Sequence, residues 1–107
     1  MKTFFDLPTI SGERAQAGKL YQEFLRVPAL SAGVYVLPAG SADPQTPHKQ
    51  DEVYYVVRGR GRIRVASEEQ VVKAGSVIFV AAQVEHCFFD VSEELEVLVF
   101  FAPAEAL

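Results

Sequence analysis

The stretch that decides the fold is 47-PHKQDEVYYVVRGRG-61, in which a histidine and a glutamate stand four residues apart at the start of an apolar run. Side chains of a β-strand alternate between two faces, so Glu52 shares one face with Tyr54 and Val56, while the opposite face is also apolar. A strand that is apolar on both faces needs cover on both sides. We therefore expect Glu52 to point inward and a second copy of the chain to cover the outer face, as a homodimer.

Short β-like runs continue on both sides of this stretch. Residues 13–27 allow a helix or an edge strand by their apolar spacing, and we favour the strand. Gly59 and Gly61 are expected to flank a tight turn. Many short strands with hardly any helix predict an all-β sandwich or barrel. The runs are rich in Val, Ile, Tyr and Phe and occupy residues 33–38, 52–57, 62–67, 70–75, 76–82, 86–91 and 95–103.

Composition limits the kind of protein and its partners. The chain has 107 residues, 50% of them hydrophobic, which predicts one domain over residues 1–107. A net charge of -4 without a basic run argues against nucleic acid or an anionic membrane as partner. Asp6 and Pro8 interrupt the first residues before an apolar leader develops, and Cys87 is the only cysteine. These features predict a soluble, cytoplasmic protein whose partner is a small molecule.

The two histidines of the chain suggest a metal site. His48 and Glu52 lie at the start of one strand, and His86 begins another run after a turn. If these strands are neighbours in a barrel, the three residues converge as a set of two histidines and one carboxylate, which suits Fe, Mn, Ni, Co or Zn. Spacing alone does not separate this site from ordinary surface or core histidines.

A wider pattern of residues resembles the cupin superfamily, in particular its small type-2 proteins with one conserved barrel. In the first motif, Gly40 stands upstream, three residues separate His48 from Glu52, and six residues separate Glu52 from Gly59. The second motif begins after a further fifteen residues, and its positions are taken by Gly75, Ala81, Gln83, His86 and Asp90. The resemblance covers about residues 33–103 and implies a cupin double-stranded β-helix, or jelly-roll barrel.

The resemblance also implies one divalent metal ion per chain, bound by His48, Glu52 and His86. Cupins usually add a further histidine, and Thr46 takes its place here, so the fourth ligand is lost. Ala81, Gln83 and Asp90 replace the usual Pro, Gly and Asn at turn positions, which should change local rigidity and keep the fold. Three other side chains stay open as additional oxygen ligands or as plain solvent-facing residues: Gln45, Thr46 and Gln50.

Alternation along the strands predicts the rest of the pocket. Tyr54 shares a face with Glu52, while Phe88 and Asp90 share a face with His86, so the pocket should contain Tyr54, Phe88 and Asp90. Glu52 and Tyr54 are the candidate catalytic residues. Tyr54 fits equally well as a core tyrosine whose hydroxyl reaches solvent.

Three functions fit this pocket. We favour a small-molecule metalloenzyme, of oxygenase or isomerase type, in which the metal acts as a Lewis acid or an oxygen-activating centre. A non-catalytic barrel that binds a small molecule is the first alternative, and a barrel with a degenerate metal site is the second. The cupin fold hosts many reactions, so the resemblance does not choose among the three, and whether the chain is an enzyme stays open.

Overall fold

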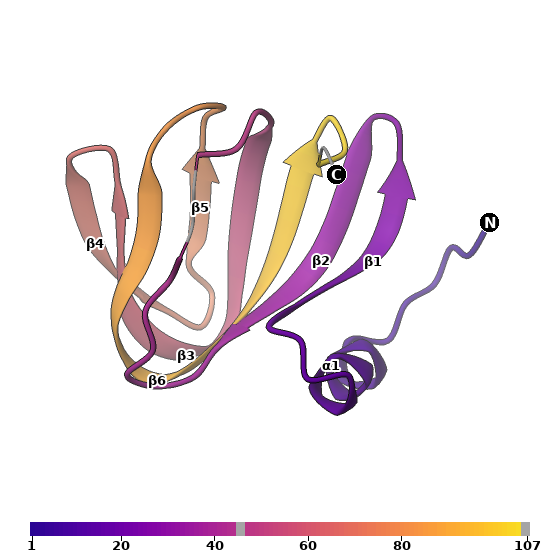
Figure 1. The fold of residues 1–107 in the computed structure, drawn as a ribbon, viewed down its shortest axis with the longest axis horizontal. Coiled ribbons are helices and arrows are strands. Elements are labelled where there is room, and N and C mark those ends of the chain that lie inside the picture. Colours follow the sequence, from indigo (N-terminus) through magenta and orange to yellow (C-terminus); the bar gives the residue numbers. More distant parts are fainter. Residues whose placement is uncertain (45–46, 106–107) are drawn as a thin grey trace.

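The computed structural model of the protein describes residues 1–44 and 47–105. All strand pairs in this part of the chain are antiparallel, in the order β1-β2-β6-β3-β4, with β5 also paired to β3. The sheet curls round on itself (Figure 1), and the expected all-β fold is confirmed. The elements are α1 (Leu7–Gln16), β1 (Tyr21–Val27), β2 (Leu30–Leu37), β3 (Asp51–Val65), β4 (Glu68–Lys73), β5 (Val77–Val80) and β6 (His86–Ala102).

Two long strands, β3 and β6, form the frame of the molecule. They pair from Asp51 opposite Ala102 to Val65 opposite His86, with register shifts in the middle. Gly59 lies among these shifts with a φ of +98°, and a Cβ there would collide with the carbonyl oxygen of Glu94. The expected tight turn at Gly59 and Gly61 is therefore wrong, because the chain continues through both residues as one bulged strand. Bulges bend and twist a strand, and both strands curve round at this point (Figure 1).

The inward face of the sheet forms the main core. Glu52, Tyr54 and Val56 of β3 are buried while Tyr55 between them is exposed, which confirms the expected alternation. Buried aliphatic and aromatic side chains of β2, β4, β5 and β6 complete this core. Glu52 is the first inward position of β3, so it lies where the core meets one end of the barrel.

The helix α1 was not expected from the sequence. Asp6 caps it by accepting hydrogen bonds from the backbone N–H and the hydroxyl of Thr9, and Pro8 occupies its first turn. Ile10 packs with Val34 and Val36 on the outer side of β2, so this strand is covered on both faces. The strand favoured for residues 13–27 is confirmed for β1 and wrong for residues 13–20, which end the helix and turn into β1. In the described part of the chain, no helix has the length and apolarity needed to cross a membrane.

Candidate metal centre

The candidate metal ligands His48, Glu52 and His86 come together where three strand ends meet. Glu52 lies between Val80 of β5 and Phe101 of β6. His48 precedes β3, and its carbonyl oxygen accepts a hydrogen bond of 2.7 Å from the backbone N–H of Gln83 in the turn before β6. The two motif regions are thus joined directly, which places His86, the first residue of β6, beside the start of β3.

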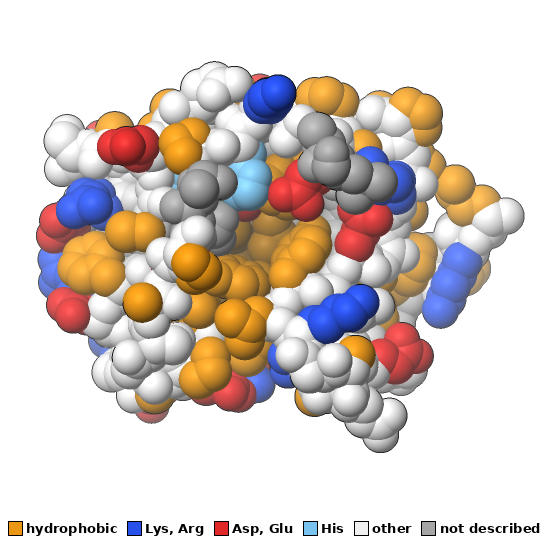
Figure 2. All heavy atoms as spheres, in the orientation of Figure 1, with side chains coloured by type: hydrophobic (Ala, Val, Ile, Leu, Met, Phe, Trp, Pro, Cys, Tyr) orange, Lys and Arg blue, Asp and Glu red, His pale blue; other side chains and the backbone are white. Residues whose placement is uncertain are grey.

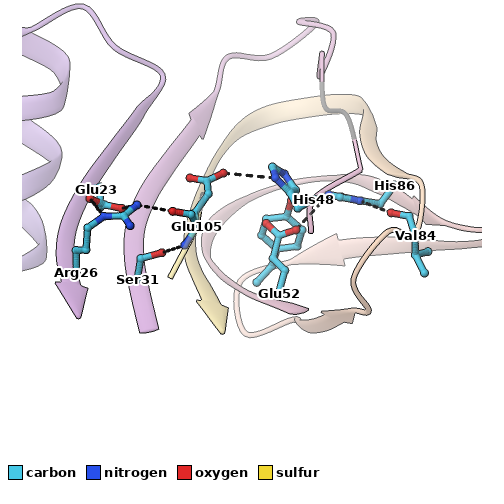
Figure 3. A network of polar contacts seen from close by, with 9 residues as sticks. Glu23, Arg26, Ser31, His48, Glu52, Val84, His86 and Glu105 are labelled. Atoms are coloured by element: carbon cyan, nitrogen blue, oxygen red, sulfur yellow. Dashed lines mark hydrogen bonds and ion pairs between the residues drawn. The ribbon is translucent and has the colours of Figure 1, made fainter. Parts of the chain in front are cut away.

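His48, Glu52 and His86 form one compact group. Each offers a ligand atom, and these atoms lie within 4.8 Å of one another. Nε2 of His86 lies 3.2 Å from Oε1 of Glu52, and the centroids of the two imidazole rings are 5.6 Å apart. Glu52 and His86 are buried, whereas His48 stands nearer the opening with 21% of its side chain exposed. The structure thus assembles the set that the cupin resemblance implies (Figure 3).

The hydrogen bonds of His86 define which ring nitrogen carries its proton. Nδ1 lies 3.0 Å from the carbonyl oxygen of Val84, and because a carbonyl can only accept, Nδ1 is the donor. In the neutral ring Nε2 then accepts, and the Tyr54 hydroxyl donates to it over 3.1 Å. Metal-binding histidines are commonly held in this way by an acceptor on the nitrogen that does not bind the metal.

The electrostatic surroundings of His86 favour its charged form. Burial alone lowers the pKa of His86, but contact with Glu52, the hydrogen bond to Val84 and the negative charge of Glu52 together raise it above its ordinary value. Burial and the charge of Glu52 raise the pKa of Tyr54, so this hydroxyl keeps its proton and remains a hydrogen-bond donor. A cation is thus favoured at the position between Glu52 and His86.

Glu52 provides the test of whether a metal fits. Its Oε1 is buried and has no hydrogen-bond partner among the described residues, and Nε2 of His86 lies 3.2 Å away. A buried carboxylate oxygen without a donor costs free energy, and a metal ion would satisfy it. Metal bonds of about 2.1 Å set neighbouring octahedral ligands about 3 Å apart, close to the 3.2 Å between Nε2 of His86 and Oε1 of Glu52. The donor set and its geometry therefore fit a divalent transition metal.

A cavity of about 210 Å³ opens beside this group. Figure 2 shows a hollow with apolar walls and with histidine and acidic side chains at its rim. Burial raises the pKa of the Tyr21 phenol well above its ordinary value, and its hydroxyl has no hydrogen-bond partner in the described part of the chain. A ligand in the cavity could use this hydroxyl as a donor. The lining residues are Tyr21, Tyr35, Pro44, His48, Glu52, Tyr54, Val99, Phe101 and Glu105.

Asp43 supports one wall of the cavity and was not singled out from the sequence. Its carboxylate accepts a hydrogen bond of 2.7 Å from the Tyr35 hydroxyl and one of 2.8 Å from the backbone N–H of Phe88. Burial raises the pKa of Asp43, although both hydrogen bonds oppose this effect. Asp43 lies in the Pro-rich loop before His48, where an aspartate is usually a turn residue, so local sequence carries no signal of this role.

The predicted pocket residues differ in where they lie. Tyr54 lines the cavity, and Phe88 packs behind it with a centroid distance of 5.0 Å. Asp90 is exposed and lies away from the cavity, so its predicted place in the pocket is wrong. Its φ of +47° breaks the strand alternation, and the next residue, Val91, is buried instead.

The candidate additional ligands are not part of the described cavity. Gln50 is buried outside the cavity lining. Two further candidate ligands, Gln45 and Thr46, lie outside the described residues.

Comparisons with known proteins agree with this architecture. An uncharacterized protein of Streptomyces coelicolor is 48% identical over 102 residues, which cover 95% of this chain and 97% of that protein. The structure of an RmlC-like cupin from Shewanella frigidimarina matches with a TM-score of 0.70 and 25% identity, covering 78% of this chain and 75% of that one. An RmlC-like cupin with a double-stranded β-helix fold from Methanocaldococcus jannaschii matches with a TM-score of 0.70 and 18% identity, covering 78% of each chain.

These matches confirm the expected jelly-roll fold, the double-stranded β-helix. Residues 33–102 match the family model described as Cupin domain. The matched segment contains both motif regions, including the three residues of the compact group. On this match across most of its length, the chain belongs to the cupin family.

Proposed function

We propose that this cupin binds one divalent metal ion through His48, Glu52 and His86 and uses it to transform a small molecule held in the adjoining cavity. The observation that carries the proposal is the buried Oε1 of Glu52, which lacks a hydrogen-bond donor among the described residues and faces a histidine whose Nδ1 is already engaged. A metal bound there would supply Lewis-acid or oxygen-activating chemistry, of isomerase or oxygenase type.

The cavity supports a small, partly aromatic or apolar substrate. Its volume of about 210 Å³ lies below the roughly 300–1,000 Å³ of pockets for drug-sized ligands. Tyrosine, phenylalanine and valine side chains would exclude water, and the Tyr21 and Tyr54 hydroxyls would orient polar groups of the substrate. No lysine or arginine is among the described lining residues, so a negative charge on the substrate would have to be met by the metal.

Metal analysis of the purified protein tests the proposal. We expect about one metal ion per chain in the unmodified protein, and loss of that metal in His48→Ala, Glu52→Gln and His86→Ala. Glu69→Gln is the matched control, because it also removes one carboxylate charge but lies in an exposed ion pair with Arg62 on the far part of β3. A protein that stays metal-free when Fe, Mn, Co, Ni and Zn are offered would contradict the proposal and indicate a degenerate site.

A non-catalytic binding protein is the second candidate, and one observation favours it. Among the described cavity residues, His48 and Glu52 would be occupied by the metal and burial raises the pKa of Tyr21, Tyr35 and Tyr54, which leaves the carboxylate of Glu105 as the one further acid or base beside the cavity. Calorimetric titration with small phenols and short-chain carboxylates, followed by mass analysis of the recovered ligand, separates the two. Recovery of altered ligand supports the enzyme, while tight binding of unaltered ligand supports the binding protein.

We also propose that the protein is a homodimer. Four exposed apolar side chains, here called the outer patch, lie on β3, β4 and β5: Tyr55, Val71, Val77 and Phe79. Three of them also line a groove of about 540 Å³ beside β4 and β5, which are not paired with each other in the sheet. Apolar surface next to open strand edges is typical of association with another chain.

A cytoplasmic location is a further part of the proposal. Cys87 is the only cysteine in the sequence, so the chain cannot form an intramolecular disulfide. Proteins without disulfides match compartments in which thiols stay reduced. Fractionation of cells that express the protein, followed by immunodetection, would check the location.

A further inference from the structure

The last described residues fold back over the barrel opening and are fixed there by backbone hydrogen bonds. The N–H of Ala104 donates to the carbonyl oxygen of Pro28 over 3.2 Å, and the N–H of Glu105 donates to the buried Ser31 hydroxyl over 2.8 Å. The Arg26 guanidinium donates to the carbonyl oxygen of Glu105 over 2.7 Å, and Glu23 holds that guanidinium from its other side. This segment is therefore attached to the hairpin of β1 and β2 at three points.

This attachment aims one side chain at the candidate metal centre. Oε2 of Glu105 lies 3.4 Å from Nδ1 of His48, and both side chains are largely buried, with 26% and 21% exposed (Figure 3). Glu105 is not in the group of residues whose ligand atoms lie within 4.8 Å of one another. Its carboxylate therefore contacts a ligand residue from outside the group.

We propose that Glu105 is the positioning residue for His48: its carboxylate keeps the proton of the imidazole on Nδ1 and directs Nε2 toward the metal. The inference rests on the proposed function. Its basis is a parallel between the two histidines: an acceptor oxygen lies beside Nδ1 of each ring, the carbonyl oxygen of Val84 at 3.0 Å from His86 and Oε2 of Glu105 at 3.4 Å from His48. Both rings would then present Nε2 to one point, each held by an acceptor behind it.

Glu105 lies outside residues 33–102, the segment that matches the family model. Its role would therefore be added, in this chain, to the two motif regions. The family position at which a further histidine is usual carries Thr46 here. Without that fourth ligand the site loses metal affinity, and a carboxylate that orders His48 would restore part of it.

The first experiment uses nitrogen-detected NMR of the histidine rings in the metal-free protein. The chain has two histidines, so a His86→Gln variant assigns both sets of signals. Spectra are recorded at about pH 9, more than two units above the ordinary imidazole pKa. We expect the Nδ1-protonated form of His48 in the unmodified protein and a shift toward the Nε2-protonated form in Glu105→Ala. Glu105→Gln keeps an acceptor oxygen and should restore the original form in part.

The second experiment measures metal affinity by titration with Co(II), read from its visible absorption. Loss of an outer partner of a metal-binding histidine typically lowers affinity about 10–100-fold. We expect a loss of this size in Glu105→Ala, a smaller loss in Glu105→Gln, and unchanged affinity in the control Glu69→Ala. Thermal unfolding followed by circular dichroism checks that the variants remain folded.

The two experiments separate the inference from the proposed function. Unchanged His48 signals in Glu105→Ala would overturn the positioning role, even if the unmodified protein binds metal. A shift of those signals in a protein that takes up no Co(II) would keep the positioning role and overturn the metal-dependent function. Co(II) affinity within about twofold of the unmodified protein in Glu105→Ala would also overturn the positioning role, because the predicted loss is at least tenfold.

Discussion

At the scale of single residues, His86 links metal binding to protonation. Its ring contacts Val84, Tyr54 and Glu52, and these surroundings favour a positive charge that either a proton or a metal can supply. The same ring nitrogen, Nε2, faces Tyr54 and Glu52 and would have to bind the metal. Metal uptake should therefore release a proton wherever His86 is protonated beforehand.

The raised pKa of His86 predicts how the stability of the metal-free protein depends on pH. The folded protein binds this proton more tightly than the unfolded chain, so the contribution is fully present below the ordinary pKa of 6.5 and is lost as pH rises through the higher folded value. We expect the free energy of unfolding, measured in urea with a chelator present, to fall as pH rises from about 6.5 through the higher folded pKa of His86. The His86→Gln variant should show a flatter dependence, and an equal slope in both proteins would contradict the assignment.

Asp43 offers a test of how the cavity wall is held. Asp43→Ala leaves two donors, the Tyr35 hydroxyl and the Phe88 N–H, without their acceptor. Each buried donor without a partner costs about 1–3 kcal/mol, so the free energy of unfolding should fall by at least about 1 kcal/mol. Asp43→Asn should cost less, because its oxygen can accept from Phe88 while its NH₂ donates to the tyrosine oxygen. Equal urea midpoints for both variants would show that these hydrogen bonds do not support the wall.

At the scale of elements, the bulged strand β3 depends on Gly59. An alanine there would adopt an unfavourable φ and collide with the carbonyl group of Glu94. We expect Gly59→Ala to lower the free energy of unfolding by about 2 kcal/mol or more, from strain of about 1–3 kcal/mol plus the collision. Gly12→Ala in α1 is the control, since no atom lies within 4 Å of the added Cβ. It should stabilise the protein slightly, by about 0.5–1 kcal/mol, and an equally mild effect at Gly59 would contradict the bulge.

The elements also show how far the sequence alone could predict the fold. The alternation of β3 around Tyr54 follows from a period of two, which local sequence carries. The bulge at Gly59 does not, because a glycine between strand-like runs is equally typical of a turn, and the pairing of β3 with the distant β6 decides between the two. The helix α1 has Ile10 as its one buried residue, so it has no apolar stripe to reveal it, although Asp6 and Pro8 were local signals of its start.

The candidate site also contains some residues that the sequence could predict and others that it could not. His48, Glu52 and His86 could be named in advance because the spacing of the two motif regions resembles a family pattern. Asp90 was misplaced because its left-handed backbone conformation interrupts the alternation on which the prediction depended. Glu105 reaches His48 from 57 residues away through the fold-back of the chain end, and no local pattern predicts such a contact.

At the scale of the whole molecule, the outer patch governs the predicted assembly. Val77 and Phe79 are 67% and 61% exposed, and Tyr55 pairs with Val77 across β3 and β5. A charge introduced at the centre of an apolar interface would be buried without a partner, which opposes association. We therefore expect the unmodified protein to be a dimer by sedimentation equilibrium, and both Tyr55→Asp and Phe79→Asp to be monomers.

The control for this prediction is Phe4→Asp, the same change at a side chain that is 87% exposed outside the outer patch. If the outer patch is the interface, this variant stays dimeric, because the added charge remains in water. A monomeric unmodified protein would contradict the homodimer. A dimer that persists in both outer-patch variants would instead place the interface elsewhere on the surface. Since metal binding uses the opposite, inward face of β3, the monomeric variants should still hold one metal ion per chain, which separates assembly from the proposed chemistry.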